Sequence, residues 1–388
     1  MLSTLLTFAD IVLYVLFALS IGYLLLFALA SKLARPCRYP QKTATYKRFC
    51  VLFPAYKEDR VIVQAVHSFL QQNYPKEYYD VIVISDQMQA STNDTLRELP
   101  IQLLLATYDQ SSKAKALTLA VDVTINTHYD AYVIMDADNT TAPDFLDELN
   151  KAFNTGLRAV QAHRVAKNKN TDVALLDAAS EEINNAIFRS GHVALGLSSA
   201  LIGSGMAIEA DWFRSHVRYL QTAGEDKELE ALLLRERIHI GYLEHVLVED
   251  EKTQKKEVIG HQRKRWLAAQ FGSLNASLPY LPMALLKGNI DYVDKVIQWT
   301  LLPRIILLAG TFFISAIITL ISPVASLKWW ILSALLVTTL IIAIPGKLMD
   351  RKLLKAVLQV PSLALMMAGN LFKLKGVNKK FIHTEHGE

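Results

Sequence analysis

Two aspartates separated by one residue, Asp136 and Asp138, directly follow the apolar run 131–135. Because alternate side chains of a strand point to the same side, two acids at this spacing can converge on one point. Hard divalent cations prefer oxygen ligands, and Mg²⁺ binds one or two carboxylates together with substrate phosphates. The pair therefore indicates a metal–diphosphate site, although the same spacing is also found in ordinary turns. The surrounding elements bear on which interpretation holds.

The elements that would position these acids alternate regularly. Four short apolar runs are typical of buried strands, at residues 49–53, 81–84, 101–105 and 132–135. Helical patterns separate them, at residues 60–72, 93–99 and 112–127. This alternation predicts an α/β fold with a mostly parallel sheet and helices on both faces. Ligands of such sheets bind beyond the carboxyl ends of the strands, where the chain also places Asp86 and the segment 54–58.

Apolar residues are unevenly distributed along the 388 residues, which are 52% apolar with a mean hydropathy of +0.21. Residues 11–30 form an uncharged block that would span about 30 Å as a helix, the thickness of the hydrocarbon core. Similar blocks follow at residues 300–321, interrupted by Arg304, and at residues 329–344. The first block resembles a signal peptide but lacks a basic start and is too long, which favours an uncleaved anchor. The chain is thus predicted to be a membrane protein with a soluble middle.

Basic residues predict the orientation in the membrane. Six of them follow the first apolar block: Lys32, Arg35, Arg38, Lys42, Lys47 and Arg48. By the positive-inside rule this side is cytoplasmic, so we expect a multi-pass inner-membrane protein with its middle domain in the cytosol. The apolar segment 353–372 contains Lys355 and Pro361 and has basic flanks. These features favour an interfacial helix on the cytoplasmic leaflet over a fourth span.

Charge and cysteine content exclude other classes. The formal net charge is +4, and the chain has no long basic stripe with interleaved aromatic residues, so a nucleic-acid partner is not expected. Cys37 and Cys50 are the two cysteines, without metal-ligand spacing. They suit a reducing compartment and indicate no disulfide framework.

Seven motifs in order along the chain resemble those of membrane-bound family 2 glycosyltransferases, which include cellulose, hyaluronan and poly-N-acetylglucosamine synthases and ceramide glucosyltransferase. They are Phe-Pro-Ala-Tyr-Lys-Glu at 53–58, Asp86, Ser-Lys-Ala-Lys-Ala-Leu at 112–117, Asp-Ala-Asp at 136–138, Gly-Ser-Gly-Met at 203–206, Gly-Glu-Asp at 224–226 and Gln-Arg-Lys-Arg-Trp at 262–266. These segments are similar to the family's (I/F)PAYNE turn, base-contacting aspartate, GKxxAL, DxD, glycine-rich strand, (T/G)ED and QxxRW motifs.

The resemblance implies a GT-A-like nucleotide-sugar-binding fold flanked by transmembrane and interfacial helices. Donor-binding residues would be Pro54, Tyr56, Glu58, Asp86, Lys113, Asp136, Gln262 and Arg265. Asp226 would be the catalytic base, and Gly205 and Trp266 would contact the acceptor. Asp136 and Asp138 would bind Mg²⁺ or Mn²⁺. A UDP-sugar is the expected donor, but Gln87-Met88 replaces the family's Gly-Ser and Ser111-Ser112 its Gly-Gly, which leaves the base open.

The C-terminal segment 381–386, Phe-Ile-His-Thr-Glu-His, resembles the FxVTxK gating loop of cellulose synthases. Thr384 and His386 would then be gating residues. A neutral imidazole holds a diphosphate less firmly than a lysine unless the phosphates raise its pKa. A tail without this role is the alternative.

The chemistry of individual side chains suggests similar roles for three of these residues, independently of the family resemblance. Asp226 begins a predicted helix at 226–237, where the helix dipole stabilises an ionised carboxylate, although an acid there can also be a helix cap. Arg265 is a candidate bidentate partner for a phosphate. Trp266 offers an aromatic face to an acceptor sugar, or anchors the chain at the membrane interface.

One base and no second nucleophile predict a single displacement with inversion at the anomeric carbon. The expected function is sugar transfer at the cytoplasmic face to a lipid-linked or saccharide acceptor, with limited transfer favoured. A processive polysaccharide synthase, completed by a channel partner or an oligomer, and a non-catalytic membrane scaffold remain alternatives. The expected parts are an anchor at 1–32, the catalytic domain at 45–255, interfacial helices at 256–298, two spans at 299–346, and an interfacial helix with a gating-like tail at 351–388.

Overall fold

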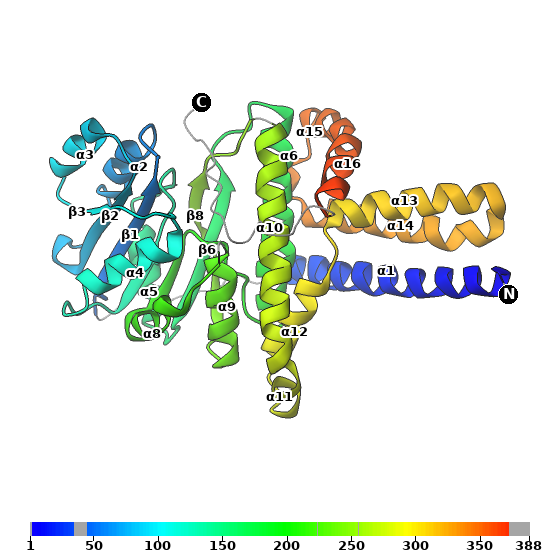
Figure 1. Ribbon diagram of the computed structural model, residues 1–388, viewed down its shortest axis with the longest axis horizontal. Coiled ribbons are helices and arrows are strands. Elements are labelled where there is room, and N and C mark those ends of the chain that lie inside the picture. Colours follow the sequence, from blue (N-terminus) through cyan, green and yellow to red (C-terminus); the bar gives the residue numbers. More distant parts are fainter. Residues whose placement is uncertain (1, 35–44, 223, 255, 372–388) are drawn as a thin grey trace.

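The computed structural model describes residues 2–34, 45–222, 224–254 and 256–371. An α/β domain forms one half of the molecule, and three long helices project together from the other half (Figure 1). These are α1 (Leu2–Leu33), α13 (Arg304–Ile321) and α14 (Pro323–Ala343). The predicted gating residues Thr384 and His386 lie outside the described residues.

The described residues form an eight-stranded sheet in the order β3-β2-β1-β4-β7-β6-β8-β5. Its strands are β1 (Phe49–Tyr56), β2 (Tyr79–Asp86), β3 (Gln102–Ala106), β4 (Ala131–Ile134), β5 (Thr140–Thr141), β6 (Ala159–Ala166), β7 (Met206–Glu209) and β8 (Ile240–Asp250). The first four strands pair in parallel, and so do β6 and β8. Strand β7 is antiparallel to both of its neighbours, and β5 is antiparallel to β8. The predicted α/β fold with a mostly parallel sheet is confirmed.

Both faces of the sheet are buried, which explains why its strands lack polar alternation. In β1, Cys50 and Leu52 face one apolar cluster, whereas Val51 and Phe53 face another. The first cluster includes residues of α4 (Lys113–Val123), α8 (Ala210–His216) and α9 (Glu225–Arg235). The second includes residues of α2 (Ile62–Phe69), α3 (Ala90–Arg97) and α5 (Phe145–Phe153). Helices therefore cover the sheet on both sides and fix where its strands end.

The three projecting helices pack through a separate apolar cluster. In the part of the chain that is described, three helical segments are long and apolar enough to cross a membrane: Thr7–Leu33, Arg304–Ile321 and Pro323–Ala343. Trp329 of α14 is fully buried, and its indole N–H donates to Asp10 Oδ1 of α1 at 2.8 Å. Lys328 forms an ion pair with the same aspartate. Polar contacts thus add to the apolar packing of α1 against α14.

Further helices connect the sheet to the projecting helices. They are α6 (Asp172–Asn185), α10 (Lys256–Ser277), α11 (Leu281–Leu286), α12 (Ile290–Thr300), α15 (Arg351–Ala356) and α16 (Val360–Leu371). Helix α10 runs across the direction of α1, α13 and α14 (Figure 1). The candidate membrane spans do not include α15 or α16. Whether these helices lie on a leaflet stays a prediction.

Candidate active site

The carboxyl ends of the parallel strands open into a cavity of about 850 Å³. Strands β1 and β2 are in register from Phe49 opposite Tyr79 to Tyr56 opposite Asp86, so both end at the same edge. Strand β4 pairs with β1 and delivers the aspartate pair to that edge. The helices α9 and α10 supply the facing wall through Asp226 and Arg265. Parallel pairing therefore brings distant polar residues together.

Most residues of the predicted site line this one cavity. They are Pro54, Tyr56, Glu58, Asp86, Lys113, Asp136, Asp138, Asp226, Gln262, Arg265 and Trp266. Gly205 is placed differently: a Cβ there would lie 2.8 Å from Val248 Cγ2 and 3.6 Å from Ala162 Cβ, so the residue packs between strands. The neighbouring Gly203 lines the cavity instead. The predicted acceptor contact at Gly205 thus falls two residues from the cavity wall.

Lys113 links three parts of the site. Ser112 caps the preceding end of α4 by accepting from Lys115 N at 3.2 Å, which fixes where the helix begins. The Lys113 ammonium forms an ion pair with Asp136 and donates to Gly203 O at 2.8 Å. Burial disfavours its charged form, but the carboxylates of Asp136 and Glu225 outweigh this effect and raise the pKa of Lys113. The residue is therefore a fixed cation at the cavity wall.

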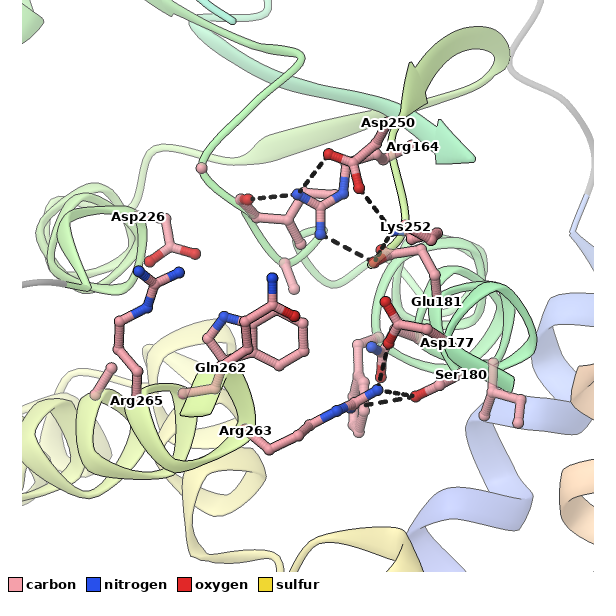
Figure 2. Close-up of a pocket in the computed structure, with 18 of the residues that line it drawn as sticks. Arg164, Asp177, Ser180, Glu181, Asp226, Asp250, Lys252, Gln262, Arg263 and Arg265 are labelled. Atoms are coloured by element: carbon pink, nitrogen blue, oxygen red, sulfur yellow. Dashed lines mark hydrogen bonds and ion pairs between the residues drawn. The ribbon is translucent and has the colours of Figure 1, made fainter. Parts of the chain in front are cut away.

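Asp226 faces the cavity from the first turn of α9. Gly224 is the N-cap residue and has no side chain to cap the helix, and Asp226 Oδ1 accepts from Lys227 N at 2.9 Å. A Cβ on Gly203, whose φ is +84°, would lie 3.7 Å from Lys113 Nζ and 3.9 Å from Asp226 Cβ. These are ordinary contact distances, so the positive φ and not a lack of space favours glycine at this position. Figure 2 shows the Arg265 guanidinium pointing toward Asp226.

Two non-glycine residues with positive φ lie next to the ends of β1 and β2. They are Lys57, with φ of 57°, and Gln87, with φ of 55°. The two turns are joined because Lys57 N donates to Asp86 O at 3.1 Å. Asp86 is 4% exposed, and its Oδ1 has no hydrogen-bond partner in the described part of the chain. Burial raises the pKa of Asp86.

The family model described as Glycosyltransferase like family 2 matches residues 47–269. The chain belongs to this family. The match begins just before β1 and ends within α10, so it includes every strand of the described sheet. The resemblance inferred from the motifs is therefore confirmed at the level of the family.

Two curated relatives are beta-monoglucosyldiacylglycerol synthases. The protein from Synechocystis sp. (strain ATCC 27184 / PCC 6803 / Kazusa) is 24% identical over 229 residues, which are 58% of this chain and 48% of the relative. The protein from Trichormus variabilis (strain ATCC 29413 / PCC 7937) is 24% identical over 248 residues, 62% of this chain and 52% of the relative. The chain thus spans about half the length of these relatives.

A solved structure shares the fold. The mannosyltransferase PcManGT from Pyrobaculum calidifontis, in complex with GDP-Man and Mn²⁺, superposes with a TM-score of 0.52 at 16% identity. The match covers 85% of this chain and 95% of that protein. At this identity the likeness concerns the fold of the family 2 glycosyltransferase and not its substrates.

The aspartate pair of this glycosyltransferase fits a divalent cation that also takes phosphate ligands. Asp138 Oδ1 accepts from Asn139 Nδ2 at 3.2 Å and Oδ2 from Glu251 N at 2.8 Å, so the carboxylate has a fixed orientation. Asp136 is one-third exposed at the cavity wall. Among the described residues, no three His, Cys, Asp or Glu side chains form a ready metal cage. The donor diphosphate would therefore have to complete the coordination.

A buried ionic cluster behind the aspartates was not predicted from the sequence. Arg164 of β6 contacts Glu181 Oε2 of α6 at 2.9 Å, and Lys252 contacts Asp250 Oδ2 at 2.7 Å (Figure 2). Burial disfavours the Glu181 carboxylate, but the charges of Arg164, Lys252 and Arg189 together outweigh this and hold its pKa well below the usual range. Arg164 and Asp250 lie near the carboxyl ends of parallel strands, so the rule that identified Asp86 could have found them, had β6 and β8 been recognised.

Proposed function

We propose that the chain transfers one sugar from a nucleotide-diphosphate sugar, expected to be a UDP-sugar, to a hydroxyl group of a membrane lipid, with inversion. The observation that carries this proposal is the continuity of the cavity. From Asp86 and Asp226 it extends to the apolar side chains of Leu340 in the candidate membrane helix α14, of Ile344 just after that helix, and of Leu363 in α16. An acceptor that enters from the membrane side would reach the donor without crossing water.

The nucleotide end is suited to a diphosphate sugar. The buried Asp86 oxygen would accept a hydrogen bond from a base N–H, as the family resemblance implies. Lys113 and Arg265 would neutralise the diphosphate, a guanidinium doing so through two parallel hydrogen bonds. A divalent cation held by Asp136 and Asp138 would add charge neutralisation when bound.

The transfer step requires one base. Asp226 would take the proton of the acceptor hydroxyl while its oxygen forms a bond to the anomeric carbon. The bond from that carbon to the diphosphate oxygen breaks, and the leaving group keeps the electron pair. Attack opposite the leaving group inverts the anomeric centre. Trp266 lines the same cavity and would offer its ring to the acceptor.

Purified full-length protein in lipid nanodiscs, given radiolabelled nucleotide sugars with Mg²⁺ or Mn²⁺, tests the proposal. We expect one lipid-soluble product band, and Asp226→Asn is expected to lower kcat by about 10²–10⁴-fold while donor Kd changes little. Asp211→Asn is the matched control, because Asp211 is 91% exposed on α8. A ladder of products would indicate processive synthesis, and loss of donor binding in Asp226→Asn would give Asp226 a structural role.

A further inference from the structure

The cavity has a second polar region between the proposed transfer site and its apolar end. It is lined there by Asp177 and Ser180 of α6, Arg263 of α10 and Arg304 at the start of α13. Figure 2 shows Arg263 directed to Asp177 and Ser180, while Arg265 of the same helix is directed to Asp226. Two arginines on one helix therefore serve different parts of the cavity.

Two guanidinium groups converge at this point on one hydroxyl. Arg263 Nη2 donates to Ser180 Oγ at 3.3 Å, and Arg304 Nη2 donates to the same oxygen at 3.3 Å. Arg304 Nη2 also donates to Ser180 O at 3.2 Å. The Arg304 side chain is thus turned toward α6 inside the protein, not toward the surrounding lipid.

The charges of this arginine pair are not balanced. Asp177 Oδ1 contacts Arg263 Nη2 at 2.6 Å and is the carboxylate of the pair. The neighbouring acid Glu181 is engaged elsewhere, by Arg164 at 2.9 Å, Arg189 at 3.4 Å and Lys252 at 3.6 Å. Arg263 thus pairs with one carboxylate, whereas Arg304 makes no ion pair among the described residues, in a setting where an uncompensated charge is costly.

Arg304 also keeps an unused donor. Its Nη1 is buried and has no hydrogen-bond partner in the described segments. Pro303 is the N-cap of α13 and provides no side-chain cap, so backbone N–H groups at this helix end add positive potential. An anion with several oxygen atoms would satisfy both the free Arg304 donor and the positive helix end. A phosphate is such an anion, and it forms paired hydrogen bonds with guanidinium groups.

We propose that Arg263 and Arg304 bind the phosphate group of the acceptor lipid, so that the substrate class is a phosphate-bearing lipid and not a neutral one. The proposal rests on the proposed function in assuming a lipid acceptor. The lipid chains occupy the apolar part of the cavity, which includes Leu340, Ile344 and Leu363. The reactive oxygen then points past Trp266 toward Asp226.

Two classes of lipid could supply this phosphate group. A phospholipid with a headgroup hydroxyl supplies a phosphodiester for the arginines and a hydroxyl for the base. A polyprenyl monophosphate supplies the phosphate alone, and its own oxygen is then the nucleophile. Because Asp226 lines the cavity as a candidate base, the hydroxyl-bearing phospholipid fits the described residues better.

Full-length protein in phosphatidylcholine nanodiscs tests this with three acceptors at equal mole fraction: phosphatidylglycerol, a polyprenyl monophosphate and diacylglycerol. We expect phosphatidylglycerol to be preferred and Arg304→Gln to raise its KM about 10-fold or more, with donor Kd unchanged. Arg263→Gln should act in the same direction, and Arg304→Lys should retain part of the affinity. Arg351→Gln, an exposed cation at the start of α15, is the control and should change nothing.

Lipid retention, measured by native mass spectrometry, provides a readout that does not need turnover. If the wild type retains phosphatidylglycerol over phosphatidylcholine and Arg304→Gln does not, the phosphate site is supported, whether or not a donor is consumed. Failure to consume any donor would instead refute the proposed function. A preference for polyprenyl monophosphate would keep the phosphate site and change the nucleophile. Diacylglycerol accepted as well as phosphatidylglycerol, or equal retention by wild type and Arg304→Gln, would overturn the inference.

Discussion

The part of the cavity that includes Asp86 and Lys113 (the proposed donor end) and the part that includes Arg263 and Arg304 (the proposed membrane end) differ in the ion pairs that their cations make. At the donor end, Lys113 pairs with Asp136 and lies 3.8 Å from Glu225, and Arg164 pairs with Glu181. At the membrane end, Arg263 pairs with Asp177, whereas Arg304 donates to Ser180 and makes no ion pair with a described residue. Ion pairs within the protein hold side chains in position before a ligand arrives, whereas a buried cation without such a pair indicates where an anionic ligand binds.

The largest expected effect concerns the donor end. Asp138→Ala removes a carboxylate that Asn139 and the Glu251 backbone hold in place, and we expect loss of both turnover and metal dependence. Mn²⁺ binding, followed by electron paramagnetic resonance in the presence of the nucleotide, should weaken about 10-fold or more. Asp144→Asn at the N-cap of α5 is the control, because its side chain makes no capping hydrogen bond. Full activity in excess chelator would show that the reaction does not require a divalent cation.

Neutralising Glu181 in the ionic cluster and Arg304 at the membrane end, each in a separate variant, tests the comparison directly. Glu181 is 5% exposed and contacts three cations, so Glu181→Gln should lower the free energy of unfolding by about 3–5 kcal/mol. Arg304→Gln removes an unbalanced cation and should cost no more than about 1 kcal/mol. Thermal and denaturant unfolding of both variants in the same detergent measures this. Similar losses would mean that Arg304 is structural.

The sequence predicted the donor end better than the membrane end for a physical reason. Strands β1, β2 and β4 are buried on both faces and appear as apolar runs, so the polar residues that follow them are easily located. The fold class and the family followed from this pattern and the motifs. Strand β6, in contrast, contains the polar residues Gln161 and Arg164, whose partners Ser204 and Glu181 are 43 and 17 positions away, and it has no such signature.

The membrane end depends on contacts between helices. Arg304 and Ser180 are 124 positions apart, and neither belongs to a motif. Arg304 interrupts the apolar block at residues 300–321, and such a charge can indicate a functional residue but does not identify its partner. Which residues of two packed helices face each other depends on tertiary packing, which the local sequence pattern of either helix does not determine. The role assigned to each site residue stays a prediction at both ends.

A smaller effect concerns the pH dependence of stability at the donor end. Burial raises the pKa of Glu225 to about 7 from an ordinary 4.5, while Lys113 opposes the shift and Asp226 adds to it. The folded state then holds a proton that the unfolded chain has released, so this group costs stability as pH rises from about 4.5 to about 7. Above pH 7 the cost is constant.

Glu225→Gln mimics the protonated side chain and isolates this contribution. The difference in Tm between Glu225→Gln and wild type should grow in favour of the variant from about pH 5 to about pH 7 and then level off. Asp211→Asn, at an exposed carboxylate, should show no such trend. A difference that is flat with pH would mean that Lys113 compensates the Glu225 charge fully, which would sharpen the contrast with Arg304.

The smallest expected effect tests backbone strain at the nucleotide end. Gln87 has φ of 55°, a conformation that glycine adopts without steric cost, and its Oε1 accepts from Tyr56 Oη at 3.4 Å. Gln87→Gly and Gln87→Ala both lose this hydrogen bond, so their difference reports the backbone alone. We expect the glycine variant to be more stable than the alanine variant by about 1 kcal/mol, measured by thermal unfolding. Equal stability of the two variants would show that the turn at residue 87 carries no backbone strain. A non-glycine residue at this position would then have no energetic cost.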